Sequence, residues 1–511
     1  MSDESNGESG GESGRGSGGG STGDWKPLLD ELERRQHRAQ EMGGAERVDR
    51  LMHARGKLDA RQRIERLFDP GSFVEIGALV GGMKTPADAL VAGFGRIDGR
   101  PAMAGAEDFS VLGGSIGQGS MAKRYRLCQL AEQERVPLVM MLEGAGHRLT
   151  STLEGGSRAP NDLLALADLS GRVPMVCLVL GASAGHGALT APLSDITIMS
   201  EAGAMFTGGP PLVKAATGED VTKAELGGPA VCAEIAGTAH NVAPDDAAAI
   251  AMARRYLSYF PQNRWQAAPR RDAPDTAPRR LERILQLVPP NARRPYDVHG
   301  VLEELVDAGS LFEVQPRYGR SLVCALAFLG GRSVAILANN PAVRAGAVDS
   351  PAAIKAMDFI ATADAFGLPL VFLCDNPGVM AGRQAERSGI LKWGGKMFRA
   401  QRRARVPKLH VTLRKTFGFG STVMGQNPFD NQTLSFAFPG VTMDAMPAAS
   451  GGRSAKLDEA TQAAVEERQA AGPWGMAQGL TYDDVIDPRE LRNKLCAGLE
   501  LLEGRRASRP A

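Results

Sequence analysis

Two stretches of this chain carry the same succession of hydrophobic and polar positions. Residues 123–146 (KRYRLCQLAEQERVPLVMMLEGAG) align without a gap on residues 355–378 (KAMDFIATADAFGLPLVFLCDNPG). In each, apolar positions recur at helical spacing, a short apolar run follows, and small residues close the stretch. Helical periodicity followed by such a run predicts an amphipathic helix leading into a buried strand and a tight turn.

A second pair of stretches repeats further along the chain. Residues 172–174 and 405–407 both read Arg-Val-Pro and open apolar runs, which end in the glycine-bearing segments ASAGHGAL and KTFGFGST. The offset from Lys123 to Lys355 and the offset from Arg172 to Arg405 differ by a single position. Alternating helices and buried strands that recur at one long period predict a duplicated α/β domain.

The small residues after each strand predict a chemical property. A chain that passes from a strand into a helix through glycine presents backbone N–H groups that have no partner inside the helix. Two such turns in each copy are suited to an oxyanion hole for an enolate or a polarised thioester carbonyl. The alternative is that these glycines only permit close packing and tight turns. Repetition at matched positions favours the two oxyanion holes.

Composition and charge narrow the class of protein. A chain of 511 residues with 43% apolar residues is long enough for two or three domains. The net charge of +1 gives no overall attraction to nucleic acid or membranes, and six scattered cysteines without a CxxC pair argue against a zinc ribbon or a disulfide framework. No apolar run of about 20 residues and no signal pattern is present. We therefore expect a cytoplasmic protein without metal.

Composition also predicts the domain boundaries. The Gly/Ser/Glu-rich segment 1–24 is expected to be a disordered tail. Surface helices, broken at Gly43 and Gly44, lead into an N-terminal domain over 25–266. The Pro/Arg/Ala-rich segment 267–295 is expected to be a linker to a C-terminal domain over 296–511, on which the last helix packs.

Several longer blocks resemble a known family. They are TGGPPLVKAATGEDVTKAELGG (207–228), RGKLDARQRIERLFDPGSFVE (55–75), LSYFPQN (257–263) and YDDVIDPRELR (482–492). Together they resemble the carboxyltransferase β subunits of biotin-dependent acyl-CoA carboxylases, of the propionyl-CoA and methylcrotonyl-CoA carboxylase type. The resemblance covers the chain from about Trp25 to its end.

The resemblance implies a fold, an assembly and a set of site residues. It implies two tandem crotonase-like (ClpP/crotonase) ββα-spiral domains in a hexamer built from dimers, with acyl-CoA on the N-terminal domain of one subunit and carboxybiotin on the C-terminal domain of another. The family's oxyanion positions transfer to residues of this chain on both sides of the site. On the acyl side they are Ala145, Gly146, Gly185 and His186, and on the biotin side Phe419 and Gly420 with Gly378 and Val379.

The implied reaction explains why no conspicuous catalytic base is present. In the family, carboxybiotin releases carbon dioxide, the biotin enolate removes the α-proton of the acyl-CoA, and the thioester enolate attacks the carbon dioxide. Two enolates require two anion holes, and backbone N–H groups supply them. Biotin is implied on a separate carrier subunit, because no Ala-Met-Lys-Met-type lysine is present. A biotin carboxylase with its carrier protein is therefore an implied partner.

The sequence departs from the family pattern near both turns. Residues 143–148 read EGAGHR where relatives have Asp-Ser-Gly-Gly-Ala-Arg. Phe419 stands where glycine is usual, and we expect its ring to narrow the biotin pocket. Thr422 occupies a position that helps to set acyl preference, and the family's Met-Gly-x-x-Gly-Ala segment is replaced over 446–450. These changes leave the acyl-CoA, and α- against γ-carboxylation, open.

Other motifs compete with this interpretation. Residues 181–185 (GASAG) match the G-x-S-x-G nucleophile elbow, and Asp195 or Asp220 and His240 follow in the order of a hydrolase triad. Histidines 147 and 186 sit where they face a thioester or act as caps. Residues 389–396 miss the P-loop pattern at two positions, so ATP chemistry is not expected.

Three functional hypotheses follow. The first is a carboxyltransferase subunit acting on an acyl-CoA. The second is the same fold run in reverse, as a biotin-dependent decarboxylase or transcarboxylase subunit. The third is a non-catalytic structural paralogue in a mixed hexamer with a second carboxyltransferase chain, which Phe419 and the changed 446–450 segment motivate.

Overall fold

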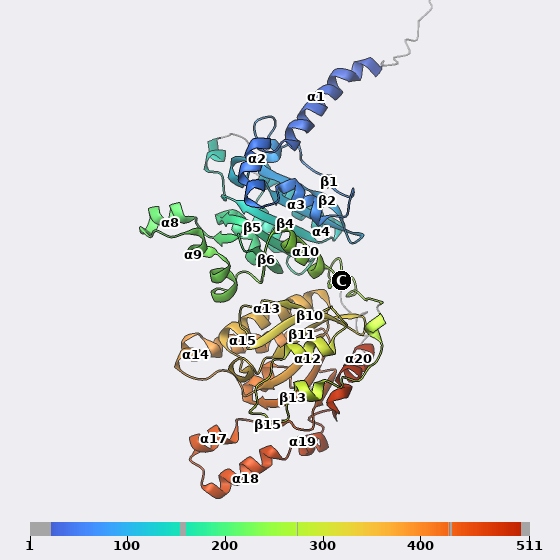
Figure 1. Ribbon diagram of the computed structural model, residues 1–511, viewed down its shortest axis with the longest axis vertical. Helices are drawn as coiled ribbons and strands as arrows, with labels where there is room; N and C mark the ends of the chain where they lie inside the picture. Colours follow the sequence, from blue (N-terminus) through green and yellow to red (C-terminus); the bar gives the residue numbers. More distant parts are fainter. Residues whose placement is uncertain (1–21, 154–159, 273, 428, 430–431, 502–511) are drawn as a thin grey trace, which may run out of the picture.

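The chain folds into two lobes that follow one another along its long axis (Figure 1). A computed structural model describes residues 22–153, 160–272, 274–427, 429 and 432–501. Each lobe is built around one eight-stranded sheet. The upper lobe contains the first sequence repeat and the lower lobe the second (Figure 1).

The two sheets have the same topology. The first runs β1-β2-β3-β4-β5-β6-β8 with β7 paired to β5, and the second runs β9-β10-β11-β12-β13-β14-β16 with β15 paired to β13. In the first sheet the strands are β1 (Val74–Glu75), β2 (Leu90–Ile97), β3 (Arg100–Glu107), β4 (Leu138–Gly144), β5 (Met175–Ala184), β6 (Ile196–Ser200), β7 (Ala204–Phe206) and β8 (Asn241–Ala243). In the second they are β9 (Phe312–Val314), β10 (Leu322–Leu329), β11 (Arg332–Asn339), β12 (Leu370–Asn376), β13 (Lys408–Phe417), β14 (Leu434–Ala437), β15 (Thr442–Asp444) and β16 (Asp484–Val485).

The offset predicted from the sequence holds strand by strand. Strands β2, β3 and β4 precede β10, β11 and β12 by the same offset that separates Lys123 from Lys355, and β5 precedes β13 by one position more. In both sheets an antiparallel hairpin joins a run of parallel strands. The central strands are buried along their whole length, which explains their continuous apolar sequences. The duplicated α/β domain is therefore confirmed.

The helices repeat in the same way. Helices α4 (Gln118–Glu134) and α13 (Ser350–Phe366) correspond, and the short α6 (Gly185–Ala188) corresponds to the start of α16 (Gly418–Val423). Helix α13 begins at the Asp349 cap, whose carboxylate accepts the Ala352 N–H, and ends at a left-handed Gly367. The remaining helices are α1 (Thr22–Gln40), α2 (Ala45–Leu51), α3 (Ala60–Leu67), α5 (Asp162–Leu169), α7 (Thr190–Leu193), α8 (Pro210–Thr217), α9 (Lys223–Gly227), α10 (Asp246–Leu257), α11 (Ile284–Leu287), α12 (His299–Leu305), α14 (Arg383–Arg387), α15 (Ile390–Arg403), α17 (Ala448–Ala455), α18 (Glu459–Ala470), α19 (Trp474–Gln478) and α20 (Leu491–Leu501).

A pair of buried lysines marks the duplication in the core. Lys123 Nζ donates to the carbonyls of Ala87 (3.1 Å) and Leu90, and Lys355 Nζ donates to those of Gln315 (3.3 Å) and Tyr318 (2.8 Å). Burial lowers the pKa of Lys123 to about 8 and also lowers the pKa of Lys355. Lys123 thereby ties α4 to the chain at the start of β2, and Lys355 ties α13 to the chain just before β10.

The two lobes share one hydrophobic core at their junction. The Tyr259 ring stacks on Phe328 with centroids 5.1 Å apart, and its hydroxyl donates to the Ser310 carbonyl at 2.6 Å. Asn241 Nδ2 donates to the Glu313 carbonyl at 2.8 Å. These contacts join the end of the first repeat to the first strands of the second.

The expected tail and linker differ in detail from the structure. Residues 1–21 of the expected tail lie outside the described residues, and α1 begins at Thr22, inside the segment 1–24. The segment 267–295 contains α11, and Leu281 and Ile284 are fully buried in the core of the second lobe. A Pro/Arg-rich composition concealed these two apolar anchors.

The structure also tests the helices predicted before the first domain and at the end of the chain. It confirms some of these predictions and contradicts one. The break between surface helices near Gly44 is confirmed, since that residue has φ 90° between α1 and α2. Helix α3, by contrast, buries Arg63 and Leu67 completely and is part of the core. The last helix, α20, packs Leu495 into the second lobe, as the sequence predicted.

Candidate functional site: two matched pairs of turns

The first turn of each pair follows the strands β4 and β12. A short parallel bridge fixes each turn, since Ile116 N–H donates to the Gly146 carbonyl (2.8 Å) and Val348 N–H to the Gly378 carbonyl (3.3 Å). Both glycines have positive φ, 81° at Gly146 and 123° at Gly378. Because L side chains rarely adopt this conformation, glycine is required in both copies.

The second turn of each pair follows β5 and β13. Here Gly185 and Gly418 have the same φ of 52°, and each begins a short helix. The first N–H groups of a helix have no intrahelical acceptor. In the first copy these groups belong to Gly185 and His186, and in the second to Gly418 and Phe419, followed by Gly420.

The two turns of a pair lie against each other. A Cβ added at Gly146 would lie 2.6 Å from the Ala184 carbonyl oxygen, at the end of β5. A Cβ added at Gly420 would lie 2.6 Å from Gly378 Cα and would overlap Asn376 Oδ1. Glycine at these positions therefore lets two backbone segments approach closely. In each copy, the site residues expected from the sequence lie next to one another.

Not every expected amide is available in the first copy. The Ala145 N–H donates to the Gly113 carbonyl at 3.0 Å and is already used. The corresponding residue in the second copy is Pro377, which has no N–H group. The Gly146 N–H has no acceptor among the residues that the structure describes. The donors expected at this turn therefore narrow to Gly146.

The second copy narrows in a similar way. The Gly378 N–H donates to Asn376 Oδ1 at 2.9 Å, within the turn itself. The Val379 N–H has no acceptor within the described ranges of the chain. Asn376 is fully buried and has no side-chain counterpart in the first copy, where Gly144 stands. The two candidate holes thus have similar backbone paths. The N–H group left without an acceptor belongs to Gly146 in the first copy and to Val379 in the second.

A buried ionic cluster supports the second turn of the first copy. Arg124 contacts Glu107 (3.0 Å) and Asp162 (2.8 Å) and donates to Thr190 Oγ1 (2.6 Å), and Asp162 lies 2.6 Å from His186 Nε2. Burial opposes ionisation of Asp162, but hydrogen bonds from His186 and Arg124 lower its pKa. Burial raises the pKa of Glu107 against the attraction of Arg124. The His186 ring is therefore held in place by a buried carboxylate.

Matched carboxylates precede the first turns. Glu143 is bound by Arg63 Nη2 (2.6 Å) and by Lys57, and Asp375 is bound by Arg414 Nε (2.6 Å). The alignment of Glu143 with Asp375 was visible in the sequence, but their cationic partners were not. Arg63 and Lys57 come from a distant block of the chain, and no local pattern marks them.

Phe419 packs against α15, and its expected narrowing of the biotin pocket stays a prediction. Its ring lies edge-on to Phe398, with centroids 5.8 Å apart, and Gly394 lies beneath it. Both belong to α15, so the ring packs back onto the helix, and 36% of the residue stays exposed. Thr422, half-buried, lies one turn further along α16. The changed segment 446–450 leads into α17, and nothing in the structure explains that substitution.

The hydrolase alternative is not supported. Ser183 Oγ is buried and has no hydrogen-bond partner in the described part of the chain. His240 Nδ1 accepts the Thr197 N–H at 2.9 Å, and Asp195 accepts the Met175 N–H at 2.7 Å. Histidine 147 lies 3.5 Å from the Ser151 hydroxyl. These groups form no nucleophile–base–acid chain.

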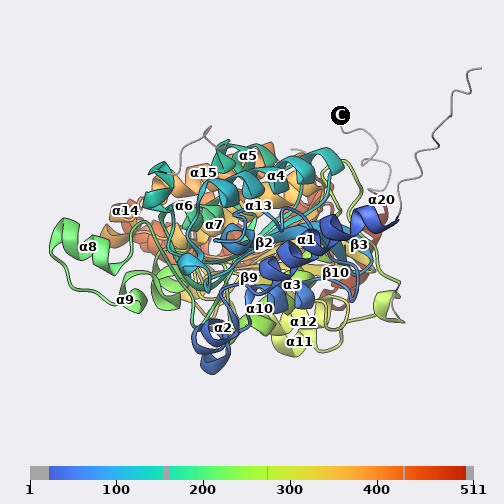
Figure 2. The same cartoon turned by 90° about the horizontal axis from the view of Figure 1, so that it is seen from above.

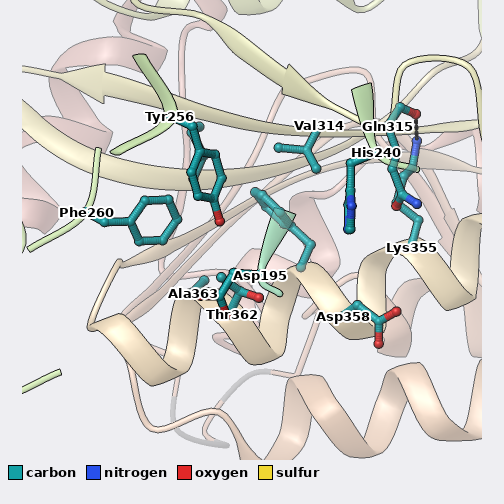
Figure 3. Close-up of a pocket in the computed structure, with 12 residues that line it drawn as sticks. Asp195, His240, Tyr256, Phe260, Val314, Gln315, Lys355, Asp358, Thr362 and Ala363 are labelled. Atoms are coloured by element: carbon teal, nitrogen blue, oxygen red, sulfur yellow. Dashed lines mark hydrogen bonds between the residues drawn. The ribbon is translucent and has the colours of Figure 1, made fainter. Parts of the chain in front are cut away.

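Asp195 and His240 instead line a small cavity between the lobes. Its volume is about 20 Å³, and Figure 3 shows Tyr256 and Phe260 from the first lobe facing Lys355 and Asp358 on α13. Burial raises the pKa of Asp195 to about 7 and lowers that of His240 to about 4. A cavity of this size has room for one water molecule.

We expect Asp195→Asn to stabilise the protein increasingly as pH rises. The native carboxyl binds its proton up to about pH 7, whereas the unfolded one releases it near pH 3.9. Wild-type stability therefore falls from about pH 4 to pH 7, and the variant's advantage reaches at most about 4 kcal/mol. Urea unfolding at pH 5 and pH 8 measures it. The exposed Asp220→Asn is the control, and equal pH dependence of all three proteins would contradict the expectation.

The described residues contain neither a candidate membrane-spanning helix nor a candidate metal-binding cluster. No helix there is long and apolar enough to cross a membrane. Nor do any three His, Cys, Asp or Glu side chains in residues 22–501, outside the gaps, gather as metal ligands would.

Comparison with known proteins agrees with the geometry. A family model described as "Carboxyl transferase domain" matches residues 51–511. The methylmalonyl-CoA carboxyltransferase 12S subunit of Propionibacterium freudenreichii subsp. shermanii is 37% identical, over 93% of this chain and 94% of its own. The mitochondrial propionyl-CoA carboxylase beta chain of Sus scrofa is 31% identical, over 94% and 92%.

A solved structure extends the agreement to three dimensions. The transcarboxylase 12S hexamer, with methylmalonyl-coenzyme A and methylmalonic acid bound, superposes with a TM-score of 0.88 at 35% identity. The match covers 95% of this chain and 98% of that one. The two lobes are therefore crotonase-like domains, as the resemblance implied. The chain belongs to the carboxyl transferase family, as a carboxyltransferase subunit of the biotin-dependent acyl-CoA carboxylases.

Proposed function

We propose that this chain moves a carboxyl group between carboxybiotin and an acyl-CoA, using its two pairs of turns as two oxyanion holes. The observation that supports this most is the duplication of the turn geometry. Gly185 and Gly418 share one φ value, and the same bridge fixes Gly146 and Gly378. The fold alone needs only tight turns, but two matched pairs of turns that each leave amides open suit a reaction with two enolates.

Each hole has its own residues. On the acyl side we assign the donors to Gly146, Gly185 and His186, with Ala145 shaping the turn. On the biotin side we assign them to Val379, Phe419 and Gly420 through their N–H groups. Gly378 and Thr422 then lie beside the bound group.

The residues act by position and charge. Biotin, bound on its carrier, supplies the nitrogen that carries the carboxyl group and accepts the substrate proton. Backbone N–H groups stabilise an enolate oxygen without reorganising, and removal of one such donor elsewhere costs about 2.7–4 kcal/mol of barrier. Arg124 and Asp162 hold His186 still, so that the helix start at Gly185 keeps its direction.

A second copy of the chain completes the site in this proposal. Large apolar side chains are exposed in both lobes: Leu149 (83%) and Leu164 (65%) in the first lobe, and Leu391 (79%) and Phe429 (79%) in the second. Exposed large apolar side chains suit an interface between protein chains. Helices α8 and α9 also project from the body in both views (Figures 1 and 2). We therefore assign a hexamer built from dimers to this chain; the solved relative is a hexamer.

The test is a carboxyl-transfer assay. The purified chain is mixed with biotin carboxylase, biotinylated carrier, ATP, labelled bicarbonate and a panel of acyl-CoAs from acetyl to long-chain. We expect label in at least one acyl-CoA, and the preferred member names the substrate. The reverse assay, from a malonyl-type thioester to biotin, distinguishes decarboxylase or transcarboxylase function.

Absence of transfer in either direction by a folded hexamer would contradict the proposal. Co-purification with a second carboxyltransferase chain that alone restores activity would then favour the structural paralogue. The Phe419 ring, packed on α15, leaves the adjacent amides in place and gives no support to an inactive site.

A further inference from the structure

Helix α15 carries a row of cations along one face. Lys392, Lys396, Arg399 and Arg403 are spaced by four, three and four residues, which places them on one side of a helix. We call these four residues the α15 stripe. The helix sequence ILKWGGKMFRAQRR contains no acidic residue. Eleven residues of helix span about 16 Å, so the stripe is long enough to face a protein surface.

The stripe is exposed and electrostatically unbalanced. Lys392, Arg399 and Arg403 are exposed and Lys396 is half-buried. None of the four forms an ion pair with a carboxylate in the described part of the chain. Some other surface cations are paired, as Arg34 and Arg35 are with Glu31 on α1. Because the whole chain has a net charge of only +1, this helix is a local positive surface.

The helix that carries the stripe packs on the biotin-side turn. Phe419 rests on Gly394 and Phe398 of the same helix. Lys392 and Lys396 lie over the Trp393 ring, 4.7 and 4.8 Å from its centroid. By helical spacing, Gly394 and Phe398 lie on a different side of α15 from the stripe, so this helix packs its inner side on the turn that holds Gly420 and presents the stripe on its outer side.

The C-terminal end of the stripe, at Arg403, opens into a basic groove. A cavity of about 300 Å³ at the junction of the lobes is lined by Arg264, Arg403 and Arg405, with Asp364 as its acidic member. Asp364 Oδ1 accepts the Arg405 N–H at 2.6 Å, so part of its charge is already used. Positive charge thus continues along α15 to the junction of the lobes.

We propose that the α15 stripe receives an acidic face of the biotin carrier domain and guides its biotin to the turn at Gly420. This inference rests on the proposed carboxyl transfer. A convex row of cations offers no pocket that would enclose a phosphate of coenzyme A, but it fits an extended acidic protein surface. The helix that carries the stripe packs on the turn to which the carrier must deliver its biotin. Complementary charge of this kind accelerates encounter and fixes orientation.

The experiment compares two biotin sources with one variant. In Arg399→Glu/Arg403→Glu the changes leave the Trp393 and Phe419 contacts in place. The reaction is followed from a malonyl-type thioester to either the biotinylated carrier domain or free biotin. We expect the KM for the carrier to rise about tenfold at low salt, with less salt dependence than in wild type. The kcat/KM for free biotin should stay unchanged.

The matched control is Arg66→Glu/Arg126→Glu, which makes the same charge change at exposed positions on α3 and α4. It should leave both reactions unaltered. Direct titration of the biotinylated carrier domain against wild type and variant, at low and high salt, tests the contact without turnover. Wild type that transfers to neither acceptor but binds the carrier through the stripe would defeat the proposed function and keep the docking surface.

Four results would overturn the docking proposal. They are an unchanged carrier KM and affinity, an equal loss with carrier and free biotin, dissociation of the hexamer in the variant, and loss of RNA binding with carrier affinity intact. The third would assign the stripe to contact with a second copy, and the fourth to a nucleic acid.

Discussion

Replacing Gly420 by alanine is expected to lower kcat for carboxyl transfer about a hundredfold or more, the scale of losing an oxyanion donor. The added Cβ would overlap Asn376 Oδ1 and lie 2.6 Å from Gly378 Cα. Asn376 holds the Gly378 N–H, so its displacement opens the first turn of the pair as well. Steady-state kinetics with the carrier as donor measure the effect.

The effect should be confined to the biotin side. The KM for acyl-CoA is expected to change little, because the acyl-side turns lie in the other lobe. Gly395→Ala is the matched control, since an added Cβ there meets no atom within 4 Å and lies on the neighbouring α15. Normal turnover by Gly420→Ala, or an equal loss in Gly395→Ala, would contradict the assignment of this turn.

Replacing Arg124 by methionine is expected to lower the free energy of unfolding by about 3–5 kcal/mol, the usual result of leaving buried charges without their partner. Arg124 is 2% exposed and neutralises both Glu107 and Asp162. Loss of the cation also frees the Asp162–His186 pair, so turnover should fall in molecules that remain folded. Urea denaturation and kinetics below the midpoint separate the two effects.

The control for Arg124 lies two residues away. Arg126 is exposed on the same helix and donates to Gln129, one turn along, so Arg126→Met should change stability by less than about 0.5 kcal/mol. A loss of under about 1 kcal/mol in Arg124→Met would show that Glu107 and Asp162 become neutral at little cost.

The sequence was sufficient for the repeat and its turns. Helix, strand and turn recur at one nearly constant offset, and buried parallel strands have the uninterrupted apolar sequences that make such a repeat visible. Gly146 and Gly378 were recognisable because few other residues adopt their φ values. These features were predictable because each depends on residues that are close together in the sequence.

What the sequence could not predict depends on contacts between distant segments. Arg63 binds Glu143 and Asp246, which lie 80 and 183 residues away, and no spacing rule joins them. The direction of the Phe419 ring depends on a small residue on α15, and the use of the Ala145 N–H depends on Gly113. Burial of Leu281 in the expected linker likewise became visible only with the second core in place.

The buried lysine pair has a consequence for chemical durability. An amine whose pKa lies near 8 is partly unprotonated at neutral pH and is a good nucleophile toward thioesters. Lys123 is such an amine, in the lobe assigned to the thioester substrate. It is 4% exposed and its Nζ is bound to two carbonyl oxygens, so an activated acyl group has no path to it. The packing that joins helix to hairpin thereby protects the enzyme from acylation by the thioester that it handles.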